Sequence, residues 1–300
     1  MEIQSIPTVT VRYCGRDFSE PDLNVIRAII ADSVRHPTRA SIARAVCERL
    51  SWLRPDGRLK DMPARVALLR MAEDGLITLP AATRRYEPRQ AITFTNASAP
   101  TEPISGSRGD LTGLELRLVT GRAETRLWKE LIERHHYLGY NPLPGAQARY
   151  LILAGQQLLG AIGFGAAAWK VAPRDRFIDW TTTEREKNLH LVVNNARFLI
   201  LPWVQVRNLA SSVLAMAAQR VKQDWPELYG YQPVLLESFV EKDRFRGTSY
   251  LAANWLRLGQ TQGRGKLDRH HLRSQPVKDI YVYPLTRNFR QILTGGGTEG

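Results

Sequence analysis

One segment constrains the fold of this chain more than any other. Residues 197–214 read RFLILPWVQVRNLASSVL, an apolar strand followed by a short turn and the start of a helix. Residues 233–240 (PVLLESFV) then predict a second strand, and residues 250–259 (YLAANWLRLG) predict a helix that leads into a third. Strands that alternate with helices in this way indicate an α/β (α+β) domain, a mixed sheet with helices packed against it.

The residues before this segment extend the same pattern. A strand is expected at 114–120 (LELRLVT), and a helix at 123–137 (AETRLWKELIERHHY) with Leu127 and Leu131 facing the core. Residues 148–168 predict an antiparallel hairpin that turns at 154–156. We therefore expect one domain over 114–294, followed by a disordered tail at 295–300.

A change in composition predicts where the chain divides. Residues 96–113 (NASAPTEPISGSRGDLTG) are rich in Ser, Pro, Gly and Thr and have no apolar periodicity, which is typical of a linker. They separate a domain at 1–95 from the larger one.

The domain at 1–95 has the pattern of a winged helix. Apolar stripes predict helices at 20–34, 41–50 and 62–75, the third with Val66, Leu69 and Met71 packed inward. Residues 76–80 (LITLP) and 91–95 (AITFT) then predict the two strands of a wing, joined by a basic tip.

In such a domain the third helix lies in the DNA major groove and the wing contacts the backbone. Arg65 and Arg70 on the helix, with Arg84 and Arg85 at the wing tip, are the candidate DNA contacts. Winged helices also serve as protein-interaction modules, so that alternative stays open.

The net charge favours a polyanionic partner. The chain has a formal charge of +13 and a pI near 10.1. Residues 114–300 hold 26 Lys/Arg against 16 Asp/Glu, so most of the excess lies in the larger domain. Basic side chains that neutralise phosphates release counterions, and DNA is the expected partner. A merely soluble basic protein is the alternative.

Other compositional features exclude several classes of protein. No window has the roughly 18 consecutive apolar residues of a membrane span, and the N-terminus has no signal pattern, so a cytoplasmic protein is expected. Cys14 and Cys47 lie in no zinc motif, and a disulfide framework is not expected. Cys47 is expected to be a buried residue of a helix.

Residues 197–214 and 250–259 resemble the GCN5-related acyltransferase (GNAT) fold. In that family a splayed strand precedes a loop whose backbone N–H groups hold the cofactor pyrophosphate at a helix N-terminus. The resemblance implies that acyl-CoA would be bound by Asn208, Leu209, Ala210 and Ser211. An ordinary helix start is the alternative.

Short motifs also resemble the Mom-type DNA-modifying proteins of phages, which are GNAT-like. The motifs are His136–Tyr137, an Asn-x-x-Ser helix start at residue 208, and Tyr250 with Asn254 and Trp255.

Longer blocks resemble the Druantia DruA family. They include HHYLGYNPLPGAQARYLI, GAAAWKVAPRDRFIDW, NLHLVVNNARFLILPWV and LLESFVEKDRFRGTSYLAANW. This resemblance implies a role in bacterial anti-phage defence, with other defence-system proteins as partners. Relatives of the family are also associated with transposable elements.

Five residues are candidates for chemistry. His136 ends a helix, where the dipole favours a charged imidazole, and with Tyr137 it forms a candidate pair. Asn195 and Arg197 share one face of a strand, which suits anion or base recognition. Glu237 is expected to point into the same cleft and to form an acid/base pair with His136. Capping and a buried polar network are the alternatives.

Further basic and aromatic residues are candidate DNA contacts. Trp169, Lys170 and Arg174 lie in a segment that mixes aromatics with bases, which suits unpaired nucleic acid. Arg246, Arg264 and Lys266 belong to glycine-rich basic stretches. The carboxylates that a two-metal nuclease would need (Asp175, Asp179, Glu184, Glu237 and Asp243) follow no recognisable pattern.

We therefore expect a DNA-binding component of a Druantia-type defence system. A transposon-associated protein that cleaves or joins DNA, with a divalent metal, is one alternative. An acyl-CoA-dependent DNA-modifying transferase is another.

Overall fold

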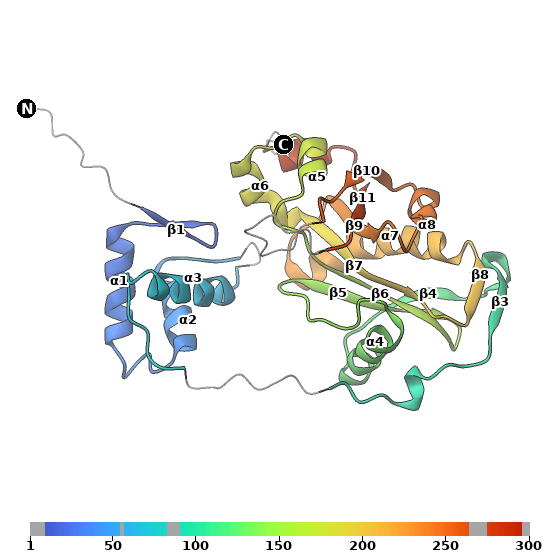
Figure 1. Cartoon of the computed structure of the whole chain (residues 1–300), viewed down its shortest axis with the longest axis horizontal. Coiled ribbons are helices and arrows are strands. Elements are labelled where there is room, and N and C mark those ends of the chain that lie inside the picture. Colours follow the sequence, from blue (N-terminus) through green and yellow to red (C-terminus); the bar gives the residue numbers. More distant parts are fainter. Residues whose placement is uncertain (1–9, 55–56, 83–90, 264–274, 296–300) are drawn as a thin grey trace, which may run out of the picture. The chain divides into compact units, whose positions relative to one another are not determined.

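The computed structural model describes residues 10–54, 57–82, 91–263 and 275–295. The chain forms two compact units, Met1–Gln90 and Ala91–Gly300 (Figure 1). Within the described ranges, no helix combines the length and the apolar character that a membrane span requires.

The small unit begins with a hairpin of β1 (Val11–Tyr13) and β2 (Arg16–Phe18). Its two-residue turn has Cys14 at φ 51° and Gly15 at φ 78°, the positive values of a type I′ turn. Three helices follow, as the apolar stripes predict: α1 (Glu20–Ala31), α2 (Arg39–Arg49) and α3 (Asp61–Glu73). Cys47 is buried between them, as expected.

The packing of α3 differs from the prediction. Val66 and Leu69 are 37% and 40% exposed, while Met71 is buried with Ala64, Ala67 and Leu68. At 100° per residue these four form one face, and the two small alanines let α2 approach closely. Val66 and Leu69 therefore lie on the outer face.

The predicted wing is not formed by the residues expected to form it. Residues 76–80 and 91–95 have no strand pairing, and the tip at 83–90 lies outside the described residues. Residues 91–95 belong to the large unit, because the backbone N–H and hydroxyl of Thr95 donate to Glu130 at 2.8 and 2.7 Å.

The large unit is built on a seven-stranded sheet in the order β10-β11-β9-β7-β6-β5-β4. The strands are β4 (Leu114–Leu118), β5 (Gln147–Ala154), β6 (Gln157–Ala166), β7 (Val192–Ile200), β9 (Leu235–Glu241), β10 (Leu256–Gln260) and β11 (Lys278–Pro284). Every neighbouring pair is antiparallel except β7 and β9, which are parallel.

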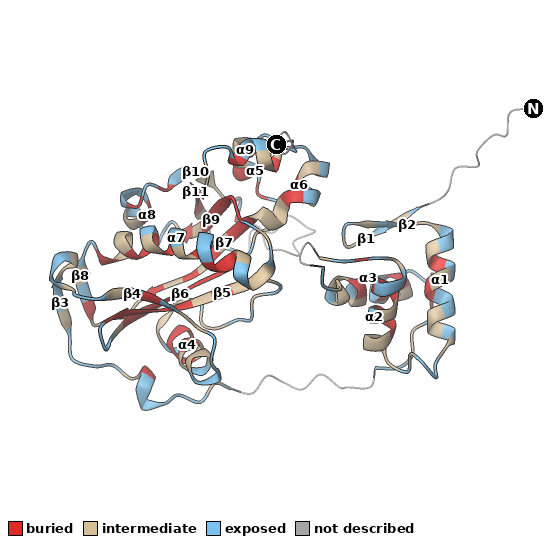
Figure 2. Cartoon of the chain, turned by 180° about the vertical axis from the view of Figure 1, so that it is seen from behind, coloured by how far each residue is buried: buried red, intermediate tan, exposed pale blue. Residues whose placement is uncertain are grey.

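Helices cover both faces of this sheet. Helix α4 (Arg122–His135) follows β4 and lies on one face, while α7 (Leu209–Tyr229) connects β7 to β9 and lies on the other (Figures 1 and 2). The short α8 (Thr248–Ala252) precedes β10. This order of strands and helices confirms the mixed sheet with flanking helices that the sequence predicts.

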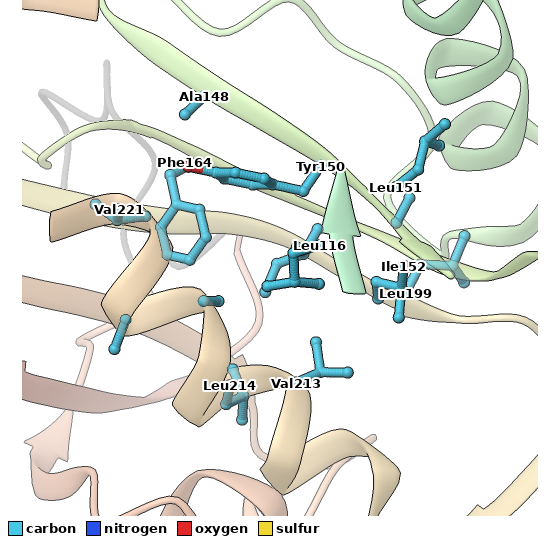
Figure 3. Close-up of a cluster of buried hydrophobic side chains, with 14 of the residues drawn as sticks. Leu116, Ala148, Tyr150, Leu151, Ile152, Phe164, Leu199, Val213, Leu214 and Val221 are labelled. Carbon is cyan, nitrogen blue, oxygen red and sulfur yellow. The ribbon is translucent and has the colours of Figure 1, made fainter. Parts of the chain in front are cut away.

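The main core lies between the sheet and α7. Figure 3 shows Tyr150 and Phe164 of the sheet beside Val221 of the helix, with Leu116 above Val213 and Leu214. Complete burial of each such aliphatic side chain stabilises the fold by roughly 1.5–3 kcal/mol. A second core is formed where α5 (Ala172–Ile178), α6 (Thr182–Asn188) and α9 (Phe289–Leu293) pack at the end of the sheet.

The residues expected to form a linker are part of the large unit. Within 96–113, β3 (Ile104–Ser107) pairs in parallel with β8 (Val204–Arg207), and the chain divides instead at Gln90–Ala91. The pairing supplies backbone hydrogen bonds that composition does not reveal. Two short 3₁₀ turns, Asn96–Ser98 and Arg108–Asp110, flank β3.

Gly163 provides a test of the packing between β6 and α4. A Cβ atom there would lie 2.7 Å from the ring of Trp128. Gly163→Ala should therefore lower the free energy of unfolding by about 1–3 kcal/mol, measured by urea denaturation. Gly109→Ala is the control, because its Cβ would meet nothing closer than 3.7 Å. Equal stability of the two variants would contradict this account of the packing.

Candidate functional site

The candidate site is a cavity of about 490 Å³ at the point where β7 and β9 part. Residues 192–195 of β7 pair with 235–238 of β9, and beyond them the two strands diverge. The cavity is lined by the C-terminal end of α4, the second half of β7, β9, and residues 244–250. None of the lining residues is Asp or Glu.

A chain of hydrogen bonds holds the strands at the point of divergence. Ser238 on β9 donates to the Tyr250 hydroxyl at 3.0 Å, and that hydroxyl donates to Oδ1 of Asn195 on β7 at 2.7 Å. The Asn195 amide donates to the carbonyls of Gly163 and Arg197, both at 3.2 Å. Both amide donors and the side-chain oxygen of Asn195 are thus engaged, and the residue positions the strands.

The same carbonyls flank a bulge in β7. Asn195 pairs with Phe164 and Arg197 pairs with Gly163, so Ala196 is an extra residue in the strand. A bulge turns the side chains that follow it, and residues 195–200, with Asn195 and Arg197 among them, all line the cavity.

Arg197 is a buried cation that has no carboxylate partner among the described residues. It is 9% exposed, and its Nε and Nη1 atoms donate to the carbonyls of Gly139 and Ala196 at 3.3 and 2.7 Å. Burial lowers the pKa of the guanidinium group. A guanidinium has five N–H donors. The other three, including both on Nη2, have no acceptor among the described residues.

An unpaired charge is costly to bury, so this arrangement is suited to a ligand that brings acceptors or negative charge. Among the predicted site residues, Arg197 is the one whose contacts point most directly to a ligand.

His136 lies beside Arg197 and is neutral at neutral pH. Burial, and then the Arg197 charge, lower the pKa of its imidazole to about 4. The expectation of a charged His136 is therefore wrong, because these effects outweigh the helix dipole. Its Nδ1 accepts from the backbone N–H of Leu138 at 3.2 Å, which leaves Nε2 as the protonated nitrogen.

Aromatic rings line the mouth of the cavity. His136 stacks on Tyr137 with ring centroids 4.8 Å apart, and Phe245 lies 5.4 Å from Tyr137. The guanidinium of Arg244 lies 4.9 Å from the Tyr137 centroid. Burial raises the pKa of Tyr137, and the charge of Glu241 raises it further. The Tyr137 hydroxyl therefore keeps its proton at neutral pH.

Glu237 does not reach this cavity, so the expected acid/base pair with His136 is not formed. Because strand side chains alternate, Ser238 faces the cavity and Glu237 faces the opposite side of the sheet. Glu237 is fully buried, forms an ion pair with Arg174 at 2.7 Å, and accepts from the backbone N–H of Ala168 at 2.7 Å. Glu237 thus belongs to a buried polar network, which was the alternative to a role in chemistry.

Arg174 is likewise not available to DNA. Its side chain is fully buried, where it pairs with Asp175 at 2.7 Å as well as with Glu237. Its neighbours Trp169 and Lys170 are exposed, as a nucleic-acid contact requires, and Arg185 lies 5.8 Å from the Trp169 centroid.

The residues that the resemblance implies for the cofactor do not line the cavity. Leu209 is buried in the core, and Asn208, with a left-handed φ of 63°, makes no side-chain cap. The Ser211 hydroxyl donates to the Asn208 carbonyl at 3.1 Å. These residues and Ala210 therefore do not fit a pyrophosphate site continuous with the cavity.

The remaining predicted residues are placed as follows. Arg65 is half-buried and pairs with Asp61 at 3.2 Å, Arg70 is exposed on α3, and Arg246 lines the cavity. Arg84, Arg85, Arg264 and Lys266 lie outside the described residues. In the part of the chain that the structure describes, no three His, Cys, Asp or Glu residues come together as a metal site.

Arg244 and Phe245 were not identified as site residues from the sequence. The signal is the run Arg-Phe-Arg-Gly at 244–247, in which an aromatic lies between two cations. Gly247 ends it at φ 69°, packed so closely on the Tyr281 ring that a Cβ would overlap it.

A second hollow, of about 460 Å³, lies at the N-terminal end of α4. It is lined by Arg122, Arg126 and Lys129, with Ile92 and three threonines.

A family model described as Druantia protein DruA matches residues 70–275. No curated protein matches the chain. A mutant of the spermidine N-acetyltransferase SpeG from Vibrio cholerae is similar in structure, with 12% identity and a TM-score of 0.39 over 59% of this chain and 96% of that one. FeeM, an N-acyl amino acid synthase from uncultured soil microbes, has 13% identity and a TM-score of 0.36 over 57% and 92%.

The pKa of His136 provides a test of its environment. It lies near 4 in the folded chain, against 6.5 for a free imidazole, so the unfolded chain binds more protons between these values. Stability due to the neutral ring is present above pH 6.5 and is lost toward pH 4. Between pH 7.5 and 4.5 the wild type should lose about 2 kcal/mol more than His136→Gln, measured by urea unfolding. Parallel pH profiles would contradict a buried, neutral His136.

The Arg174–Glu237 pair provides a second test. Glu237→Ala leaves a buried guanidinium without one of its partners and should lower the free energy of unfolding by about 3–5 kcal/mol. In the double variant Arg174→Met/Glu237→Leu, apolar side chains replace both charges, and most of that loss should be recovered. A double variant as unstable as the single one would show that the shapes, rather than the charges, matter at this position.

Proposed function

The chain belongs to the DruA family of Druantia proteins, and from this membership we propose that it is a DNA-binding component of a bacterial anti-phage defence system. Its family model covers residues 70–275, which include the whole cavity. Other proteins of the same defence system are its proposed partners.

The observation that carries the DNA proposal is the buried Arg197 in a cavity without acidic lining residues. Arg244 and Arg246 at the same cavity are exposed and can contact phosphates outside it. The net charge of +13 supports a polyanionic ligand over a neutral one. Donors and aromatic rings at one cavity are the groups that nucleic-acid sites use.

The lining favours binding over DNA cleavage or acyl transfer. Asn195 and Tyr250 are engaged with each other, and Glu237 is committed to Arg174 on the far side of the sheet. What remains at the cavity are N–H groups, hydroxyls and aromatic rings, which are suited to recognise a ligand.

A protein-binding role for the small unit is favoured by one observation. Met62, Val66 and Leu69 form an exposed apolar stripe on α3, the helix expected to enter the major groove. We propose that α3 contacts another protein of the system while the large unit contacts DNA.

DNA binding is tested with double-stranded, single-stranded and forked DNA over a salt series. The variant Arg244→Ala/Arg246→Ala should bind more weakly, and its slope of log K against log salt should fall by about 2, because each lost phosphate contact removes about 0.9. Arg117→Ala/Lys222→Ala is the control, since it removes two exposed charges that do not line the cavity.

An equal effect of the two double variants would attribute binding to overall charge, not to this site. No binding to any of the three DNA forms would overturn the proposed function. The same reactions, repeated with acyl-CoA or magnesium and followed by product analysis, would detect DNA modification or cleavage.

A further inference from the structure

The cavity contains more aromatic and apolar surface than phosphate binding requires. Phe198, Leu199 and Val240 line it, and Tyr137 and Phe245 stand at its mouth. Phe245 is 45% exposed, although burial of a phenylalanine side chain is favourable. Exposed rings that lie beside a cavity are suited to stack on a flat ligand.

Arg197 and His136 present N–H groups at the cavity that have no acceptor among the described residues. Arg197 has three such N–H groups, and neutral His136 adds one at Nε2. A ligand in this cavity must therefore present acceptors. Among the four DNA bases, guanine presents two adjacent acceptors, O6 and N7, that match the fork of a guanidinium.

We propose that the cavity takes one unpaired nucleobase, with guanine preferred, stacked on the exposed ring of Phe245 and bound at its acceptor edge by Arg197. This inference rests on the proposed DNA binding and specifies which part of the DNA enters the site. The exposed Arg244 and Arg246 then contact the phosphates on either side of that nucleotide.

The size of the cavity is consistent with this ligand. Its volume of about 490 Å³ lies within the range of roughly 300–1,000 Å³ that is usual for small-molecule sites. A base inside a duplex cannot reach a buried arginine, so it must be unstacked first. Single-stranded, mismatched or bulged bases lose the least on unstacking and should enter most readily.

The hydrogen-bond chain of Ser238, Tyr250 and Asn195 makes the cavity rigid at its closed end. Because these three side chains satisfy one another, they do not compete for the ligand. The recognition groups are therefore Arg197 and His136 inside, with the exposed ring of Phe245 at the mouth.

The experiment uses the full chain and DNA hairpins that differ at a single bulged position. The bulge is guanine, 7-deazaguanine, adenine, cytosine, thymine or an abasic site, and binding is measured by fluorescence anisotropy at one salt concentration. A bulged base should bind about tenfold more tightly than the abasic site, as expected for stacking on aromatic rings. Guanine should bind most tightly, and 7-deazaguanine, which lacks the N7 acceptor, several-fold less tightly.

Three variants connect this preference to the site. Phe245→Ala should remove most of the difference between base and abasic site, whereas Phe94→Ala, which removes an exposed aromatic that does not line the cavity, should leave it unchanged. Arg197→Lys should keep the gain from stacking but bind all four bases alike, because a lysine lacks the guanidinium fork. Thermal melting of each variant confirms that it is folded.

The outcomes separate this inference from the proposed function. Equal binding of abasic and base-bearing hairpins, with normal salt dependence, would overturn the base pocket and leave DNA binding in place. Competition by free guanosine monophosphate without any effect of the bulged base would identify a small-nucleotide site and also overturn it. Failure to bind any hairpin would instead contradict the proposed function itself.

Discussion

The hydrogen bonds that join Ser238, Tyr250 and Asn195 determine most of what is distinctive about the large unit. Parallel strands that begin in register, as β7 and β9 do, would ordinarily continue to pair. Here the hydrogen-bonded side chains lie at the point where the strands diverge. The Asn195 side-chain amide donates to the carbonyls of Gly163 and Arg197, which flank the bulge. Because Tyr250 belongs to α8, the same bonds also fix the loop that carries Arg244 and Phe245 at the mouth of the cavity.

Much of this arrangement could be predicted from the sequence, because it follows from local periodicity. The alternation of strands and helices after Arg197 determines a mixed sheet, and the spacing of Asn195 and Arg197 places both at one cavity. The adjacency of His136 and Tyr137 at a helix end is visible directly. What periodicity leaves open is which of two faces points outward. On β9 the alternation of side chains places Glu237 and Ser238 on opposite faces, but it does not say which of them lies on the side of His136. On α3 the periodicity does not say that Ala64 and Ala67, and not Val66 and Leu69, face inward.

Long-range hydrogen bonds are the other source of error. Residues 91–113 have the composition of a wing strand and a linker, yet Thr95 satisfies the buried Glu130 and β3 pairs with β8. The local sequence does not predict that Thr95 binds Glu130, 35 positions away, or that Ile104 pairs with Val204, 100 positions away. The neutral state of His136 could not be predicted for the same reason, since it depends on burial and then on the charge of Arg197, which a distant strand brings beside it.

The isolation of Arg197 has a consequence for the protein as a whole. A largely buried guanidinium that has no counterion among the described residues makes the free protein less stable than an apolar side chain of similar shape would. A ligand that supplies acceptors to Arg197 offsets this free-energy cost and, by mass action, shifts the folding equilibrium toward the native state. Ligand binding and folding stability are therefore coupled at Arg197. The free protein unfolds more easily than the ligand-bound protein.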